Sequence, residues 1–255
     1  MRLSRRQSLQ GFLASAAVPS AAPGAQRKAT PAIRLVILDV GGTIVEDRGN
    51  VPDILRRSLA SHGVDSTPEE IGRWRGASKR EIIRHFVEQQ TLPASTDRES
   101  LTTAIYHQFT AELIEVYRSV PPIAGAEEAI REMRQRGFLV ATTTGFDRAI
   151  TASIFDRLDW SKYFAAIICS DDVAQGRPSP FMLFHAMEAA RVNDVAEVMA
   201  VGDTPLDLQA GTNAGLRAVV GVLSGASTAD KLRREPHTHI LQSVANLPSL
   251  LTAKL

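Results

Sequence analysis

The stretch that decides the fold is IRLVILDVGGT, residues 33–43. Its first part, Ile33 to Leu38, is a short apolar run of the kind that forms a strand buried on both faces of a parallel sheet. The run ends in a loop with one carboxylate, two glycines and one hydroxyl: Asp39, Gly41, Gly42 and Thr43. Such a loop can either hold a phosphate group or attack one, and the loop alone does not decide between the two.

Outside residues 48–120, the chain after residue 30 alternates short apolar runs with helical patterns. The expected strands are 33–38, 138–142, 164–169, 198–201 and 218–222, and the expected helices between them are 126–136, 148–158, 180–190 and 206–213. This alternation is typical of a parallel sheet with helices on both faces. The predicted fold class is therefore α/β, a doubly wound parallel sheet of the Rossmann-like kind.

Residues 48–120 interrupt the alternation with helical patterns alone. Helices are expected over 52–61, after Thr67, after Ser78 and over 101–117. Thr67 with Glu70, and Ser78 with Glu81, have the spacing of capping boxes, in which each side chain satisfies a free backbone amide at a helix start. We therefore divide the chain into an α/β core (31–47 and 121–255), an all-helical insert (48–120) and an N-terminal tail (1–30).

Polar residues follow the expected strands at the points where the strands end. In a doubly wound sheet ligands bind beyond the carboxyl ends of the strands, so these residues should form one site. A carboxylate there can act as a nucleophile, an oxygen-only cluster suits Mg²⁺, and a hydroxyl, backbone amides and a fixed cation can hold phosphoryl oxygens. Singly each has an ordinary structural role, such as capping a helix or pairing with a carboxylate. The set is Asp39, Thr144, Gly145, Arg177, Asp203 and Asp207.

These motifs, in this order, resemble those of the haloacid dehalogenase-like hydrolases, and most closely their phosphonatase-like branch. The resemblance covers roughly residues 33–245. It rests on LVILDVGGTIVED, RGASKREII in the insert, TTTGFDR, CSDDVAQGRPSP and VGDTPLDLQAGTNAG, with VVGVLSGA and PHTHIL near the end. A sugar kinase of the actin and hexokinase type would explain D-x-G-G-T, but it explains neither GRPSP nor GDTPLD.

The resemblance implies a role for each matching residue. Asp39 would be the nucleophile, and the helical insert would be a mobile cap over the sheet. Mg²⁺ would be held by the Asp39 carboxylate, the Gly41 carbonyl and Asp203, with Asp207 in support. Phosphate would be bound by Gly42, Thr43, Thr144, Gly145 and Arg177.

Gly41 departs from the usual pattern of phosphomonoesterases in this family. Those enzymes carry an acid two residues after the nucleophile, which protonates the leaving group and then activates water. Glycine can do neither. Phosphonoacetaldehyde hydrolases also lack the acid, and use a cap lysine that forms a Schiff base with the aldehyde so that the C–P bond can break.

Lys79 falls where that lysine belongs, and it is the only lysine in residues 48–120. If Ser78 caps the helix, Lys79 is its first residue, and the helix dipole disfavours a cation there by about 0.3–1 kcal/mol. That would lower its pKa and favour the neutral amine that attacks carbonyls. Three roles stay open for Lys79: a Schiff-base catalyst, a cation that contacts substrate oxygens, or a solvated bystander.

Two other positions differ from the phosphonatase pattern. Ile82 stands where a histidine is expected three residues after the lysine, and Asn50 replaces a cysteine. His85, one turn further along, could substitute only if the geometry shifts. These differences bear on whether phosphonoacetaldehyde is the substrate, and they leave the chemistry of Asp39 and Mg²⁺ untouched.

The sequence thus predicts a Mg²⁺-dependent hydrolase of a small phosphonate or phosphorylated metabolite, acting through an aspartyl-phosphate. A phosphoglycolate-phosphatase-like or sugar-phosphate esterase is the alternative, and a homologue that binds a phosphorylated ligand without turnover is a further one. Beyond the small substrate, the net charge of +1 argues against a nucleic-acid or membrane partner. A homodimer is left open.

The N-terminus has a separate prediction. It starts with basic residues, continues with a short apolar run (11–18) and ends in small residues and proline, the layout of a bacterial export signal. Arg5 and Arg6 resemble a twin-arginine motif, which would make the Tat export machinery a partner and the location periplasmic. The apolar run is too short to span a bilayer. The alternative is a disordered basic tail on a cytoplasmic protein.

Overall fold

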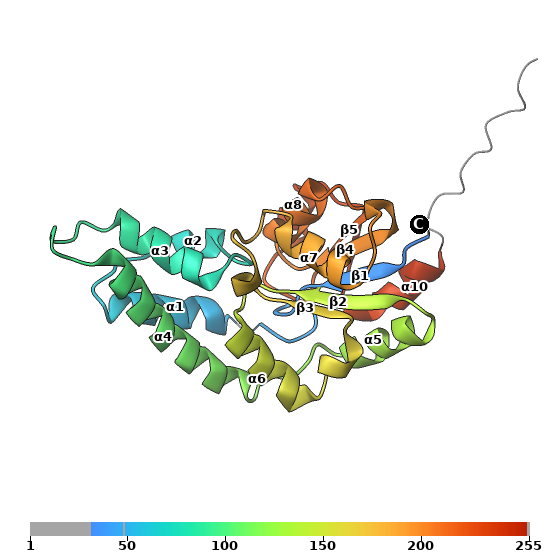
Figure 1. Cartoon of the computed structure of the whole chain (residues 1–255), viewed down its shortest axis with the longest axis horizontal. Coiled ribbons are helices and arrows are strands. Elements are labelled where there is room, and N and C mark those ends of the chain that lie inside the picture. The colour runs from blue at the N-terminus through green and yellow to red at the C-terminus, as the bar shows by residue number, and fades with distance from the viewer. Residues whose placement is uncertain (1–31, 48, 254–255) are drawn as a thin grey trace, which may run out of the picture. The chain divides into compact units, whose positions relative to one another are not determined.

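The computed structural model describes residues 32–47 and 49–253, and in it six parallel strands form one sheet in the order β3-β2-β1-β4-β5-β6 (Figure 1). All five expected strands are present, and a sixth pairs with the fifth at the edge of the sheet. The strands are β1 (Leu35–Leu38), β2 (Leu139–Thr143), β3 (Ala166–Ile168), β4 (Val198–Gly202), β5 (Ala218–Val222) and β6 (His239–Leu241).

Helices cover both faces of the sheet, as the alternating pattern predicted. Successive residues of β1 point to opposite sides, so Val36 and Leu38 pack into one apolar cluster and Leu35 and Ile37 into another. The first cluster lies under α5 (Ala126–Gln135), α6 (Arg148–Leu158) and α10 (Leu247–Thr252). The second lies under α7 (Phe181–Ala189), α8 (Pro205–Asn213) and α9 (Ala229–Arg233). The doubly wound α/β prediction is confirmed.

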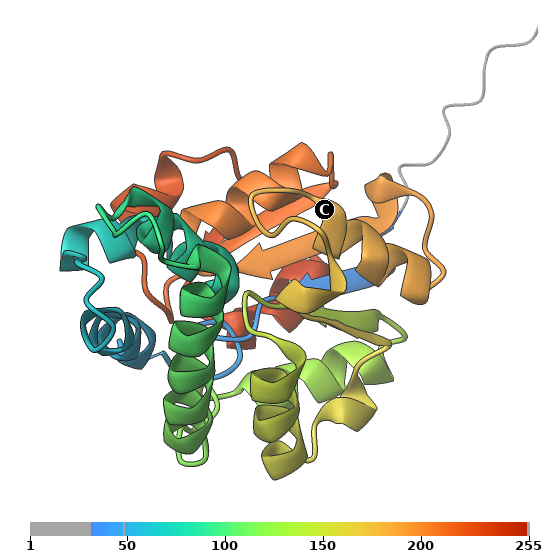
Figure 2. The same cartoon turned by 60° about the vertical axis from the view of Figure 1, so that its left-hand side comes forward.

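The insert between β1 and α5 contains four helices, and no strand occurs among its described residues. They are α1 (Asn50–Ala60), α2 (Pro68–Arg73), α3 (Lys79–Gln89) and α4 (Arg98–Tyr117). The long helix α4 packs against α1, against α3 and against α6 of the core (Figure 2). Residues 31–255 form one compact unit. The boundaries at 48 and 120, and the motion of the insert as a cap, remain predictions.

Of the two predicted capping boxes, one is present and one is absent. Thr67 Oγ1 accepts a hydrogen bond from the Glu70 amide, and the Glu70 carboxylate accepts one from the Thr67 amide at 2.8 Å. The box at Ser78 was wrong, because the Ser78 side chain makes no capping hydrogen bond. The Glu81 carboxylate accepts a hydrogen bond from the backbone amide of Gly176 at 3.0 Å instead. Glu81 therefore joins the helical insert to the core loop that carries Arg177.

The predicted export signal, residues 1–30, lies outside the described residues. In the part of the chain that the structure describes, none of the helices is both long enough and apolar enough to cross a membrane.

Candidate active site

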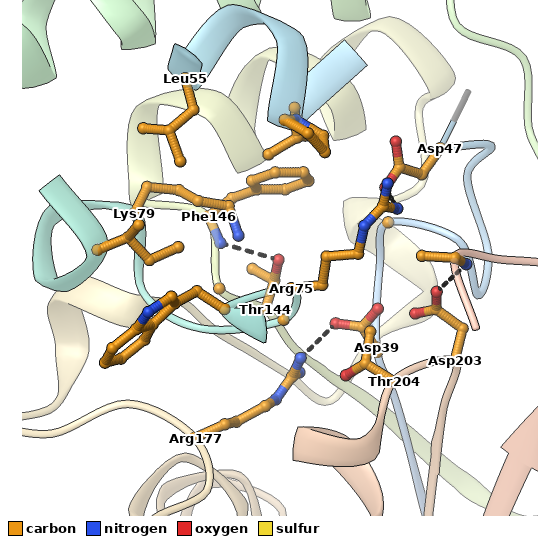
Figure 3. Close-up of a pocket in the computed structure, with 18 of the residues that line it drawn as sticks. Asp39, Asp47, Leu55, Arg75, Lys79, Thr144, Phe146, Arg177, Asp203 and Thr204 are labelled. Carbon is orange, nitrogen blue, oxygen red and sulfur yellow. Dashed lines mark hydrogen bonds and ion pairs between the residues drawn. The ribbon is translucent and has the colours of Figure 1, made fainter. Parts of the chain in front are cut away.

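The carboxyl ends of β1, β2 and β4, with the loop after β3, bring the expected polar residues to one end of the sheet (Figure 3). They face a cavity of about 50 Å³ whose opposite wall belongs to the helical insert. Asp39, Gly41, Thr144, Gly145, Arg177 and Asp203 line this cavity. Gly42, Thr43 and Asp207 are not part of its lining.

Asp39 is 5% exposed and accepts a hydrogen bond from Arg177 Nη1 at 2.8 Å. Burial raises the pKa of Asp39 to about 6; Arg177 opposes this rise and the Asp207 charge adds to it. The hydroxyl of Thr43, in the same loop, donates a hydrogen bond to the other carboxylate oxygen of Asp39 at 3.4 Å. The carboxylate is thus held in a fixed orientation, which a nucleophile requires.

Arg177 bridges two carboxylates. Its Nη1 lies 2.6 Å from Asp207 Oδ1 as well as 2.8 Å from Asp39 Oδ1, while Nη2 donates to the carbonyl and hydroxyl of Thr143. Both side-chain contacts are buried, so the guanidinium offsets negative charge that water cannot reach. The predicted role of Arg177 in binding phosphate remains a prediction, since its visible partners belong to the protein.

Three carboxylates could hold a metal ion. Oxygens of Asp39, Asp203 and Asp207 lie within 4.8 Å of one another, and all three residues are buried. Among the described residues, Asp203 Oδ1 has no hydrogen-bond partner, although the Ala226 amide donates to Oδ2 at 2.6 Å. Burial raises the pKa of Asp203 well above its usual value, and the charges of Asp39 and Asp207 raise it further. An unpartnered buried oxygen in an oxygen-only cluster fits Mg²⁺.

Glycines allow the Asp203 carboxylate to sit where it does. A Cβ at Gly42, whose φ is +83°, would lie 2.5 Å from Asp203 Oδ2, and a Cβ at Gly225 would lie 2.0 Å from the same oxygen. The absence of a side chain at Gly42 therefore leaves room for the Asp203 carboxylate in the cluster. Gly225 and the Ala226 amide were not among the predicted site residues, because nothing in the sequence of the turn after β5 indicates a contact with Asp203.

Asp207 also lies in the first turn of helix α8. Its Oδ2 accepts hydrogen bonds from the backbone amide and the hydroxyl of Thr204, and Thr204 caps the helix in return. This capping box fixes the carboxylate, so that the other oxygen faces Arg177. The predicted supporting role of Asp207 fits this geometry.

The loop after β2 forms the contact between core and insert. Thr144 is buried, and its hydroxyl accepts a hydrogen bond from the Phe146 amide. A Cβ at Gly145 would lie 2.5 Å from the Ala77 carbonyl oxygen and 2.8 Å from that of Gly76. Glycine at 145 therefore lets the insert approach the sheet closely, a role that differs from the predicted contact with phosphate, which remains a prediction.

Lys79 is the first residue of α3, as predicted, and it is 5% exposed, so the solvated-bystander role is wrong. Its Nζ donates to the Ala77 carbonyl at 2.8 Å and lies 5.4 Å from the centre of the Phe146 ring. Burial lowers the pKa of Lys79 to about 8, while Asp39 and Asp47 oppose the fall and Arg177 adds to it. The direction matches the expectation, but burial is the main cause.

The place of the missing acid is occupied by two aromatic side chains. A Cβ at Gly41 would lie 3.3 Å from Phe146 Cζ and 3.6 Å from the Tyr117 hydroxyl. The two rings pack edge to face with centroids 5.3 Å apart. Among the described residues the buried Tyr117 hydroxyl has no hydrogen-bond partner. The position that supplies an acid in phosphomonoesterases of this family is therefore flanked by the Phe146 ring under Lys79 and by the Tyr117 hydroxyl.

The departures from the phosphonatase pattern lie on the same wall or just behind it. Ile82 is buried and lines the cavity. His85 packs on the ring of Trp74 with centroids 4.5 Å apart and does not reach the lining, so it does not replace the absent histidine. Two charged residues of the lining were missed, Asp47 and Arg75. Both stand at the ends of stretches that carry the family resemblance, Asp47 in LVILDVGGTIVED and Arg75 in RGASKREII, but nothing in those stretches assigned either residue to the site.

Comparison with known proteins agrees with this site. The model of the haloacid dehalogenase-like hydrolases matches residues 33–215. A phosphonoacetaldehyde hydrolase of Bacillus cereus is 31% identical over 206 residues, covering 76% of this chain and 77% of the relative. A phosphonoacetaldehyde hydrolase of Bordetella avium is 28% identical, covering 86% and 90%.

Solved structures show the same fold. A phosphonoacetaldehyde hydrolase-like protein from Oleispira antarctica has a TM-score of 0.77 at 20% identity, covering 91% of this chain and 96% of that one. A hydrolase from Pseudomonas syringae has a TM-score of 0.76 at 17% identity, covering 86% and 98%. The family match, the relatives and the carboxylate cluster agree: the chain is a hydrolase that belongs to the haloacid dehalogenase-like hydrolases, in their phosphonatase-like branch.

Proposed function

We propose that this hydrolase cleaves the C–P bond of a small phosphonate with a carbonyl group next to its phosphonate-bearing carbon, using Mg²⁺, Asp39 and Lys79. The observation that carries the proposal is the position of Lys79. It is the buried amine of a cavity that also contains Asp39, and it lies over the apolar place where an acid would otherwise stand.

In the first step the neutral Lys79 amine adds to the substrate carbonyl carbon, and the resulting carbinolamine takes up one proton from solvent and loses water, which leaves a protonated imine. The lowered pKa makes the neutral amine available near pH 8. Phe146 and the apolar residues of the wall keep water from the imine, which would otherwise hydrolyse.

In the second step an Asp39 oxygen forms a bond to phosphorus as the C–P bond breaks. The electron pair of the C–P bond moves through the adjacent carbon to the imine nitrogen, so the carbon fragment leaves as an enamine and needs no acid at position 41. Arg177 and Thr43 hold the Asp39 carboxylate in place for this attack. Mg²⁺ held by Asp39, Asp203 and Asp207 would neutralise the negative charge of the phosphoryl group.

In the last steps the enamine takes up a proton at carbon and water releases the carbonyl product from Lys79. A second water hydrolyses the aspartyl-phosphate, which returns Asp39 and frees inorganic phosphate. The cap would exclude bulk water until the C–P bond has broken, and open for release.

A substrate panel tests this function. Phosphate release would be measured from phosphonates with a carbonyl group next to the phosphonate-bearing carbon, both phosphonoacetaldehyde and a keto acid, and from phosphate esters, including 2-phosphoglycolate and sugar phosphates, with wild type and Lys79→Arg. We expect turnover of the phosphonate that is lost in Lys79→Arg. Rapid ester turnover that does not depend on Lys79 would contradict the proposal and favour the phosphomonoesterase alternative. Absence of any turnover would favour a homologue that only binds.

A further inference from the structure

Arg75 is a cavity-lining cation that has no part in the chemistry described above. It lies in the loop between α2 and α3, and Figure 3 shows its side chain extending across the pocket toward Asp47. The same residue lines an outer groove between α2 and α8, together with Arg73 and Lys231. Arg75 therefore lies where the inner cavity meets this groove.

The loop that carries Arg75 is held firmly against the core. Gly76 has a φ of +89°, and a Cβ there would lie 2.5 Å from Thr204 Oγ1. On the next residue, the Ala77 carbonyl lies against Gly145 and accepts the hydrogen bond from Lys79. Because the two residues that follow Arg75 touch the core, its backbone is positioned before a ligand arrives, which lowers the entropic cost of binding.

The guanidinium of Arg75 has spare hydrogen-bonding capacity. Its ionic partner is Asp47, at 3.7 Å between Nη1 and Oδ2, which is beyond hydrogen-bonding distance. Within residues 32–47 and 49–253 it donates no hydrogen bond, although a guanidinium has five N–H donors. The side chain is 33% exposed, so a ligand in the cavity can reach it.

The surroundings of Arg75 favour pairing with an anion. Apart from Lys79 and the Asp47 carboxylate, the cavity wall around Arg75 is apolar, and such a wall strengthens a charge pair by excluding water. A guanidinium binds a carboxylate or a phosphoryl group through two parallel hydrogen bonds. The wall consists of Val51, Leu55, Ile71, Trp74, Ile82 and Phe146.

We propose that Arg75 is a specificity-determining residue, which selects substrates whose leaving group carries a second negative charge, a carboxylate, at the end remote from phosphorus. The proposal rests on the proposed function and narrows it. With Lys79 requiring a carbonyl and Arg75 requiring an anion, the preferred class is a keto acid with a phosphonate on the carbon next to its carbonyl, in place of a neutral aldehyde.

The test is a comparison of two inert ligands that differ in this charge. 3-Phosphonopropanoate carries a carboxylate two carbons from its phosphonate group, where the keto acid has its own, and propylphosphonate has a methyl group instead. Both would be titrated into the full chain with Mg²⁺ by isothermal calorimetry. We expect 3-phosphonopropanoate to bind roughly 10- to 100-fold more tightly to wild type, as a charged hydrogen-bonded pair contributes.

Variants assign this preference to one side chain. Arg75→Gln should bring the affinity ratio close to one, and Arg75→Lys, which keeps the charge, should keep part of it. Arg73→Gln is the matched control, since Arg73 lines only the outer groove, and it should keep the wild-type ratio. Unchanged binding of inorganic phosphate would show that each variant is folded with an intact phosphoryl site.

Two outcomes would overturn the proposal. The first is an equal affinity of wild type for the two ligands. The second is an affinity ratio that survives Arg75→Gln, because the carboxylate would then bind another cation such as Lys79. Because binding needs no turnover, the two proposals fail separately. A preference that depends on Arg75, in an enzyme that hydrolyses no phosphonate, would refute the proposed function and leave the anion site established.

Discussion

The core and the helical insert supply different parts of the cavity, and they were predictable to different degrees. On the core side Asp39, Asp203 and Asp207 cluster beyond the ends of parallel strands, and Arg177 pairs with Asp39 and Asp207. On the insert side one amine and one guanidinium stand in an apolar wall. The core side is suited to transfer of a phosphoryl group and the insert side to choice of the leaving group. Variants on the two sides should therefore differ in kind as well as in size.

The largest effect is expected on the core side, from Asp39→Asn. Removing the nucleophile should lower phosphate release by roughly 10⁴-fold or more with every substrate, since loss of a nucleophile in other enzymes has effects of this order. Release would be measured by a phosphate assay at saturating substrate. Asp230→Asn, an exposed carboxylate on α9, is the matched control. Phosphate release that survives Asp39→Asn would mean that the reaction does not use this carboxylate.

The second expected effect is a pH dependence of turnover, which comes from Lys79 on the insert side. With a pKa of about 8, the neutral fraction of Lys79 rises by roughly 20-fold between pH 6.5 and pH 8.5. Turnover of a carbonyl phosphonate should rise with it, whereas Asp39, with a pKa of about 6, is already ionised over most of this range. The check is the pH profile of kcat. A profile that is flat from pH 6.5 to 8.5 would contradict the role of the neutral amine.

A smaller effect is expected where the two sides meet, from Glu81→Gln. The Glu81 carboxylate accepts a hydrogen bond from the Gly176 amide beside Arg177, and an uncharged acceptor makes a weaker bond. We expect kcat/KM to fall by roughly three- to tenfold, with kcat less affected, because the contact holds the insert on the core. Glu88→Gln, at an exposed position of the same helix, should leave both constants unchanged. An equal effect of the two variants would show that this contact does not couple insert and core.

The smallest effect is one on stability alone, within the insert. Thr67→Ala removes the capping box of α2 and should lower the free energy of unfolding by about 1 kcal/mol. Urea denaturation followed by circular dichroism would measure it. Turnover of the phosphonate should stay at the wild-type value, and a loss of activity in a folded variant would mean that α2 does more than support the wall.

The sequence predicted the core side because its residues stand in motifs at strand ends. Parallel strands bring their carboxyl ends to one edge, so the apolar runs before Asp39 and Asp203 were enough to place both carboxylates in one site. The insert side follows no such rule. Arg75 and Asp47 reach the cavity only through the packing of the helices, and Glu81 had the spacing of a capping box but bonds to the core instead.

Burial explains the remaining differences between expectation and structure. The helix dipole alone predicted a small fall in the pKa of Lys79, whereas the structure adds a buried position over Phe146, which no local pattern around Lys79 indicates. In the same way, the absence of an acid at Gly41 was visible in the sequence, but the Phe146 and Tyr117 side chains that fill its place come from distant segments.

The central claim is that Lys79 bonds covalently to the substrate carbonyl, and borohydride trapping tests it most directly. The enzyme would be treated with phosphonoacetaldehyde and borohydride, digested and mapped by mass spectrometry, with Lys79→Arg as the control. We predict a reduced adduct on the peptide that contains Lys79, absent from the variant and still formed in Asp39→Asn. An unmodified Lys79 peptide, recovered under conditions in which the enzyme releases phosphate from this substrate, would contradict the account.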